Sequence, residues 1–161
     1  MRVSTRARYA LRMMADVARN GGKSEPVSLG AVAGRTEISR GYLEQVALSL
    51  RAGGLLRSVS GRNGGYVLTS PAAEITIGRI VETLIGPICL VRCIDDPVCC
   101  TRSENCEFLV LYRLINNRIV EVLKDHTLAD LIDPEWLRAH GGTPAEGVVE
   151  WLDGGPTGNC C

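Results

Sequence analysis

The stretch ISRGYLEQVALSLRAGGLLRSVSGRNGGYVL, residues 38–68, constrains the fold of this chain more than any other. Its first part places apolar residues at helical spacing behind Ser39, a favourable N-cap, and Gly53 and Gly54 stop that helix. The apolar positions of the helix are Leu43, Val46, Ala47 and Leu50. The two short apolar runs that follow flank GRNGG, whose glycines supply the positive φ that a hairpin turn needs. The stretch therefore predicts a helix followed directly by a β-hairpin with a basic tip.

Two further helices precede this stretch. The segment STRARYALRMMADVARN has Ser4 or Thr5 as its cap and ends near Asn20, and Ser28 caps a shorter helix. Three helices followed by a hairpin form a winged helix-turn-helix, so we expect a mainly α fold with a small β-hairpin wing over residues 1–70. In that layout the third helix enters the DNA major groove and the hairpin tip reaches the backbone or the minor groove.

Basic residues are concentrated in the same part of the chain. Residues 1–70 carry 11 Lys or Arg and 4 Asp or Glu, which is a net charge of +7. The rest of the chain carries 7 basic and 14 acidic residues, a net charge of −7, so the whole chain is neutral. This split indicates that the first part meets a polyanion, with a chance distribution of solvated charge as the simple alternative. Double-stranded DNA is the partner that we expect.

Side chains that read base edges are expected on the exposed face of the third helix, and phosphate contacts on the wing. Arg40 suits guanine, Gln45 suits adenine, and Glu44 suits the amino group of cytosine. At the wing, Arg57 and Arg62 suit phosphates or a narrow minor groove. The full set of candidate DNA contacts is Ser39, Arg40, Tyr42, Glu44, Gln45, Arg57 and Arg62. For any one of them, an ordinary exposed polar residue is the alternative.

Helices are also predicted in the second half of the chain. ITIGRIVETLIG lies in a connecting segment, residues 71–92, and residues 107–132 contain a long helix and a short helix after it. The apolar stripe of the long helix consists of Phe108, Leu109, Leu111, Tyr112, Leu114, Ile115, Ile119, Val120, Val122 and Leu123. One wing domain cannot cover so broad a stripe, so we expect a two-fold homodimer, with folding back onto the same chain as the alternative. Residues 133–161 are expected to form a flexible tail.

Four cysteines lie within CIDDPVCCTRSENC, residues 93–106, ahead of the long helix. Disulfides, a zinc site, an iron-sulfur site and inert thiols are the alternatives. The chain shows no secretory leader and no apolar run long enough to span a membrane, so we expect a cytoplasmic protein with reduced thiols and no membrane partner. Zinc sites of this kind typically have two CxxC pairs, which this loop lacks. The residues therefore favour metal or redox chemistry at soft thiolates.

The helix and wing of residues 38–68, with MRVSTRARYALRMM before them and EITIGRIVE after them, closely resemble the Rrf-type family of bacterial regulators, which includes IscR-, NsrR- and RirA-like proteins. The resemblance covers about residues 1–132 and is most specific in the YLEQ element and in the GGYVL end of the wing. It implies a dimeric winged-helix transcription factor. Glu44 stands where IscR-like members have the helix glutamate that reads bases, whereas Ser60 stands where they have a wing arginine.

The same resemblance implies an iron-sulfur cluster of the 2Fe-2S or 4Fe-4S type. The spacing matches family members best with Cys93, Cys100 and Cys106 as ligands, and with Cys99 as a spare thiol or an alternative ligand. Leu109 and Arg8 occupy the positions where relatives keep a histidine or a partner's aspartate as fourth ligand, so the fourth ligand stays unassigned. The remaining candidates are Cys99, Glu104, Asn105, Glu107, a small molecule and an open iron site.

These features together predict a DNA-binding transcriptional regulator, a repressor or an activator, that an iron-sulfur cluster controls. An incompletely protected cluster is open to oxygen, nitric oxide or loss of iron, and its state would then set the relative position of two wing domains. The alternatives are a cluster-free zinc or thiol-redox regulator and an iron-sulfur carrier, although a carrier has no need of a basic helix and wing. An enzyme is not expected, because the sequence shows no nucleophile-base pair, phosphate loop or paired carboxylates.

Overall fold

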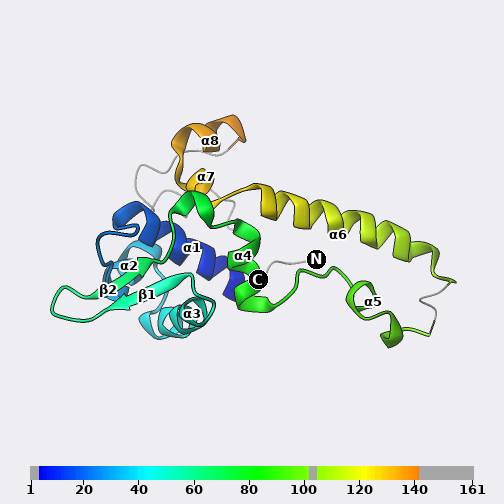
Figure 1. Cartoon of the computed structure of the whole chain (residues 1–161), viewed down its shortest axis with the longest axis horizontal. Helices are drawn as coiled ribbons and strands as arrows, with labels where there is room; N and C mark the ends of the chain where they lie inside the picture. The colour runs from blue at the N-terminus through cyan, green and yellow to red at the C-terminus, as the bar shows by residue number, and fades with distance from the viewer. Residues whose placement is uncertain (1–3, 102–104, 142–161) are drawn as a thin grey trace.

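Four helices and a two-stranded hairpin form the main body of the molecule (Figure 1). The computed structural model describes residues 4–101 and 105–141. The elements of the body are α1 (Thr5–Asn20), α2 (Leu29–Thr36), α3 (Arg40–Ala52), β1 (Leu56–Val59), β2 (Gly65–Leu68) and α4 (Ile77–Ile85), with a 3-10 turn at Ala72–Glu74. The predicted fold, mainly α with a small β-hairpin wing in a winged helix-turn-helix, is confirmed.

The first two helices begin at the serines that the sequence predicts. The hydroxyl of Ser4 accepts a hydrogen bond of 3.1 Å from the amide of Ala7, and Ser28 accepts one of 3.1 Å from Ala31. Each bond satisfies one of the backbone donors that a helix start leaves unpaired. Ser39 also precedes its helix, but its side chain makes no capping hydrogen bond.

The wing is held against the body by the short stretch of chain that precedes α2. The strands β1 and β2 pair antiparallel, with Leu56 opposite Leu68. Val27 and Tyr66 form an isolated bridge in which both hydrogen bonds measure 2.9 Å. A Cβ added at Gly65 would collide with the backbone of Val27, so this close approach requires a glycine.

The hydrophobic core of the body lies between α1, α2, α3, α4 and the wing. Its large, fully buried side chains include Met13, Met14, Leu43, Leu50 and Ile80. Each such side chain contributes roughly 1.5 to 3 kcal/mol relative to an exposed one. The buried face predicted for the third helix is confirmed, because all four of its apolar residues lie in this core.

Helix α6, Glu107–Asp125, extends away from the body (Figure 1). Its C-terminal end is attached to the start of α4, where Thr76 and Thr127 form an isolated β-bridge. The amide of Ile77 also donates a hydrogen bond of 2.9 Å to the carbonyl of His126. Within the described ranges, neither α6 nor any other helix has the length and apolar character needed to cross a membrane.

Short elements occupy the cysteine loop and the chain after α6. They are α5 (Arg92–Asp95), a 3-10 turn at Pro97–Cys99, α7 (Leu128–Ile132) and α8 (Pro134–Ala139). Helix α8 lies in the segment from residue 133 for which a flexible tail was expected. Asp133 caps this helix by accepting a hydrogen bond of 2.9 Å from the amide of Glu135, and Pro134 occupies its first turn. These two residues are a helix-start signal, which was overlooked because the residues that follow are rich in glycine. The rest of that segment, residues 142–161, lies outside the described residues.

Candidate DNA interface and cysteine loop

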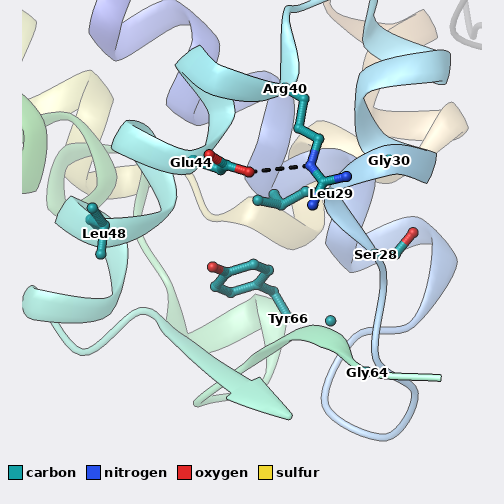
Figure 2. A pocket seen from close by; sticks show the side chains of 9 residues that line it. Ser28, Leu29, Gly30, Arg40, Glu44, Leu48, Gly64 and Tyr66 are labelled. Carbon is teal, nitrogen blue, oxygen red and sulfur yellow. Dashed lines mark hydrogen bonds and ion pairs between the residues drawn. The ribbon is translucent and has the colours of Figure 1, made fainter. Parts of the chain in front are cut away.

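A groove of about 540 Å³ lies between α3, the start of α2 and the wing (Figure 2). Its lining consists of Ser28, Leu29, Gly30, Arg40, Glu44, Leu48, Gly64, Gly65 and Tyr66. Of the candidate DNA contacts, Arg40 and Glu44 border this groove. The third helix and the wing thus share its rim, which is the arrangement that a winged helix-turn-helix uses to contact one duplex with both elements.

Arg40 and Glu44 form an ion pair on the open side of α3 (Figure 2). The Nε atom of Arg40 lies 3.1 Å from Oε1 of Glu44, one helical turn away, and both side chains are exposed. An exposed pair at this spacing contributes only about 0.3 to 0.5 kcal/mol. Separating the two side chains therefore costs little stability.

The other candidates on the third helix differ in their surroundings. Ser39 and Gln45 are exposed, whereas Tyr42 is half-buried. The Tyr42 ring packs edge-to-face against Tyr9 of α1, with 5.2 Å between the ring centroids and an interplanar angle of 83°. Such an aromatic contact fixes the angle at which two helices meet. Tyr42 thus joins α3 to α1, while the other four candidates on this helix face solvent.

The two wing arginines are exposed and do not line the groove. Arg57 lies on β1 opposite Val67, and Arg62 lies in the turn between the strands. In that turn Gly61 has a φ of 121°, and its carbonyl accepts a hydrogen bond of 3.0 Å from Gly64. Of the glycines in GRNGG, Gly61 alone has the positive φ that the sequence predicts, so this expectation is met at one position of the turn. Arg62 in the turn and Arg57 on the strand both lie outside the groove.

Several groove residues were not predicted from the sequence. Leu48 is 60% exposed and lies two turns beyond Arg40, on the same face of α3. Its spacing from Arg40 and Glu44 was a usable signal, because it places Leu48 on the same helix face as two candidate DNA contacts. No local sequence pattern predicts that Tyr66 lines the groove, because its position depends on the bridge to Val27.

The thiols of the cysteine loop, residues 93–106, are spread over separate segments of the chain. Cys93 is on α5, Cys100 follows the 3-10 turn, and Cys106 immediately precedes α6. These three are half-buried, Cys99 is exposed, and all four are free thiols. The loop thus brings thiols to both sides of the gap at residues 102–104, which lie outside the described residues.

The chemistry of these donors fits an iron-sulfur cluster, because thiolates are the usual ligands of its iron atoms. Their positions do not assemble a site: within the described ranges, no three His, Cys, Asp or Glu side chains gather as a metal-binding group. Leu109 is buried and Arg8 is half-buried, and neither side chain supplies a metal ligand. Asn105 and Glu107 are exposed beside the start of α6, and Glu104 falls outside the described residues.

The thiol of Cys99 differs from the others in its electrostatic surroundings. Desolvation raises the pKa of Cys99 above its ordinary value, and the negative charges of Asp96, Cys93 and Cys100 raise it further, against the opposing effect of Arg92. A raised pKa leaves less thiolate, which is the form that binds metals and reacts. This difference favours a spare-thiol role for Cys99.

Helix α6 presents an apolar face to solvent. Phe108, Leu111, Ile115 and Val122 are exposed, and their spacing places them on one side of the helix. The buried residues of this helix are Leu109 and Asn116. A contiguous apolar face of this kind marks a contact surface, and the described part of the chain leaves this one open.

The fold, the shared groove and the protruding helix define the class of protein: a winged helix-turn-helix transcriptional regulator. Residues 3–134 match the Rrf2 family, described as "Iron-dependent Transcriptional regulator", and the chain belongs to this family. The predicted family is therefore confirmed.

Three relatives illustrate the likeness. The HTH-type transcriptional regulator CymR of Bacillus subtilis is 38% identical over 81% of this chain and 89% of its own. Its solved structure, the "Global Cysteine Regulator", has a TM-score of 0.67 at 37% identity, over 81% of this chain and 95% of that one. The regulator IscR of Cronobacter sakazakii is 32% identical over 93% of this chain and 97% of its own. The structure of T. potens IscR has a TM-score of 0.62 at 33% identity, over 81% and 85% of the two chains.

Proposed function

We propose that this chain is a homodimeric regulator that binds double-stranded operator DNA and that its cysteine loop controls this binding. The observation that carries the DNA-binding role is the groove that Arg40 and Glu44 of α3 border together with the wing. The net charge of +7 over residues 1–70 supports a polyanionic partner for the same part of the chain. The relatives CymR and IscR, both named transcriptional regulators, support the same role.

The proposed roles divide between reading and positioning. Arg40, Glu44 and Gln45 read base edges, with Ser39 at the helix start contacting the backbone. The wing arginines, Arg57 and Arg62, neutralise phosphates. Tyr42, packed on Tyr9, orients the third helix. We retain residues 1–70 as the DNA-binding unit and residues 71–92 as the connection to the loop.

The homodimer is proposed from the open face of α6. Phe108, Leu111, Ile115 and Val122 are apolar and exposed on one side of this helix. A second copy of the same helix covers such a face by two-fold symmetry, in which each residue meets its equivalents. Two copies also supply two recognition helices, which successive major grooves about 34 Å apart require.

For the loop, we propose an iron-sulfur cluster with Cys93, Cys100 and Cys106 as its protein ligands. When bound, such a group supplies a redox-active centre that oxygen, nitric oxide or iron loss can alter. The description of the family as iron-dependent supports this proposal. Because the loop connects α4 to α6, its conformation affects the angle between the body and the long helix.

DNA binding is tested with a duplex that the purified chain selects from a random-sequence library. We expect Arg40→Ala to weaken binding of that duplex about tenfold or more and to relax the base preference at one position. The matched control is Arg138→Ala, which removes an exposed arginine from α8. Equal binding of selected and random duplexes by the unmodified chain would contradict sequence-specific regulation.

The loop is tested by anaerobic purification followed by iron, sulfide and zinc counts and an absorption spectrum. We expect iron and sulfide in the unmodified chain and their loss in Cys106→Ala. Cys89→Ala is the matched control, because the Cys89 thiol is engaged by the carbonyl of Val91 at 2.9 Å. Colourless protein with one zinc per chain would contradict the cluster.

A thiol-redox regulator without a cluster is the second candidate. The observations that favour it are that Cys93, Cys99, Cys100 and Cys106 are all free thiols and that the similar regulator CymR of Bacillus subtilis is described as a global cysteine regulator. The same purification decides between the two candidates. Metal-free protein whose DNA affinity changes with diamide, a thiol oxidant, would favour the thiol regulator.

A further inference from the structure

One polar side chain on the buried side of α6 contacts the chain that leads into the cysteine loop. Asn116 is only 7% exposed, although most of its helix is open to solvent. Its Oδ1 atom accepts a hydrogen bond of 2.8 Å from the backbone amide of Leu90. Leu90 lies between the end of α4 at Ile85 and the start of α5 at Arg92. The bond therefore ties the entrance of the loop to the middle of the long helix.

The chemistry of this position is unusual for a helix of this composition. Asparagine is a poorer helix former than leucine, and burying an amide costs free energy unless it is hydrogen-bonded. The bond to Leu90 offsets that cost and also satisfies a backbone donor. Leu109, the other buried residue of α6, lies two turns earlier on the same face. A leucine at position 116 would pack beside Leu109 but would offer no hydrogen-bond acceptor. We therefore infer that the Asn116 amide is there to bind the backbone of Leu90.

The bond between Asn116 and Leu90 is one of two attachments that hold α6 near α4. Helix α6 is attached to the start of α4 through the bridge between Thr76 and Thr127. The bond between Asn116 and Leu90 adds a second attachment, beyond the end of α4. Helix α4 in turn packs closely on α3, the proposed recognition helix. The approach is so close that a Cβ added at Gly53, at the end of α3, would collide with the Thr83 side chain of α4. Movement at the loop entrance is thus linked to both α6 and α3.

We propose that Asn116 is a positioning residue that couples the cysteine loop to the long helix through the backbone of Leu90. A change at the loop thiols shifts the entrance segment, and the Asn116 side chain transfers this shift to α6 and hence to the spacing of the recognition helices. This inference rests on the proposed control of DNA binding by the loop. It adds a residue that is neither a thiol nor a DNA contact.

The first experiment measures hydrogen exchange of the full chain around Leu90. Asn116→Leu removes the acceptor and keeps the packing, Asn116→Asp keeps an acceptor, and Asn117→Leu is the control on an exposed neighbour. We expect exchange of the Leu90 amide to accelerate about tenfold in Asn116→Leu, with partial recovery in Asn116→Asp and no change in Asn117→Leu. Unchanged exchange in Asn116→Leu overturns the contact itself.

The second experiment measures the coupling. The thiols are alkylated with iodoacetamide, and the affinity for the selected duplex is compared before and after, with unfolding midpoints as a check on the fold. We expect about a tenfold change in the unmodified chain and in Asn117→Leu, which corresponds to a coupling in the ordinary range. In Asn116→Leu we expect the change to fall below about twofold, and in Asn116→Asp to return.

The outcomes distinguish failure of the coupling through Asn116 from failure of the proposed control by the loop. Equal changes in the unmodified chain and in Asn116→Leu overturn the coupling and leave the control by the loop intact. No change in the unmodified chain overturns both the control by the loop and the coupling, while the exchange data still decide whether Asn116 holds the loop entrance. Failure of the unmodified chain to select any duplex overturns the DNA-binding function itself.

Discussion

Asp16 and Arg35 form a bidentate ion pair that joins α1 to α2. The Nε and Nη2 atoms of Arg35 lie 2.8 and 2.7 Å from the two carboxylate oxygens of Asp16. The Asp16 side chain is only 1% exposed, and Asn20 also donates to it at 3.3 Å. The hydrogen bond from Arg35 to Asp16 raises the pKa of the Arg35 guanidinium above its ordinary value, although partial desolvation opposes the rise. The pair fixes α2 against α1 and so supports one wall of the groove.

Asp16→Ala is expected to destabilise the chain by about 2 to 3 kcal/mol, which is below the roughly 3 to 5 kcal/mol of a fully buried pair because Arg35 is partly exposed. Chemical unfolding of both forms measures this loss. Glu121→Gln breaks the exposed pair with Arg118, whose two atoms lie 2.9 Å apart, and serves as the control. It should cost less than about 0.5 kcal/mol. Equal losses in the two variants would show that burial of Asp16 adds nothing.

Gly65→Ala is expected to displace the wing, because the added Cβ meets the backbone of Val27 and cannot be relieved by a rotamer change. The loss of stability should be about 1 to 3 kcal/mol. The control is Gly34→Ala, in the exposed middle of α2, where an added Cβ meets no atom within 4 Å. This change should stabilise the chain by up to about 1 kcal/mol. Unfolding midpoints measure both effects, and a stabilising Gly65→Ala would contradict the close approach.

Arg62→Ala and Arg40→Ala are expected to affect DNA binding in different ways. Arg62 lies on the hairpin tip, so its loss should weaken binding to all duplexes similarly and reduce the slope of log affinity against log salt by about 1. Arg40 borders the groove, so its loss should change base preference more than the salt slope. Affinities at several salt concentrations, with selected and scrambled duplexes, separate the two. A salt slope unaffected by Arg62→Ala would remove this residue from the phosphate contacts.

Local sequence signals were sufficient to predict the helices and the wing of the main body. Capping serines, apolar residues at helical spacing and a glycine-rich turn are short-range features, and they predicted the helix starts and the wing. They did not predict the groove, because Tyr66 reaches it only through a bridge to Val27 that lies far away in sequence. They did not predict the contact between Tyr42 and Tyr9 either, because it depends on how α1 crosses α3.

In the second half of the chain, two features depend on tertiary contacts that a local sequence pattern does not contain. An apolar stripe predicted α6, but helical spacing assigns an asparagine to the polar side, whereas Asn116 is buried against Leu90. The spacing of the cysteines likewise identifies which thiols are available, but it does not predict the distances between them in the folded chain. Three of them lie on separate elements, and their distances depend on the backbone between those elements.

Asp130 is expected to make stability depend on pH in the acid range. The Thr127 amide and hydroxyl donate to its carboxylate at 2.7 and 3.0 Å, and these bonds lower the pKa of Asp130. Because the folded-state pKa lies below the unfolded value of about 3.9, the stabilisation is present above that pH and is lost as the pH falls through the folded-state pKa. The difference in unfolding free energy between the unmodified chain and Asp130→Asn should therefore shrink below about pH 4. A difference that stays constant down to about pH 2 would contradict this role.

Ile115→Asp is expected to separate the proposed dimer. Ile115 is exposed on the apolar face of α6 in one chain, and a carboxylate buried between two copies without a partner costs several kcal/mol or more. Asn117→Asp places the same charge two positions away, on the opposite side of the helix, and should leave the assembly unchanged. Sedimentation equilibrium distinguishes a single chain of 17.4 kDa from twice that mass. Operator affinity should fall with the dimer in Ile115→Asp, because one recognition helix then binds without its partner. A single-chain mass for the unmodified protein would overturn the dimer, whereas a dimeric Ile115→Asp would move the interface to another face.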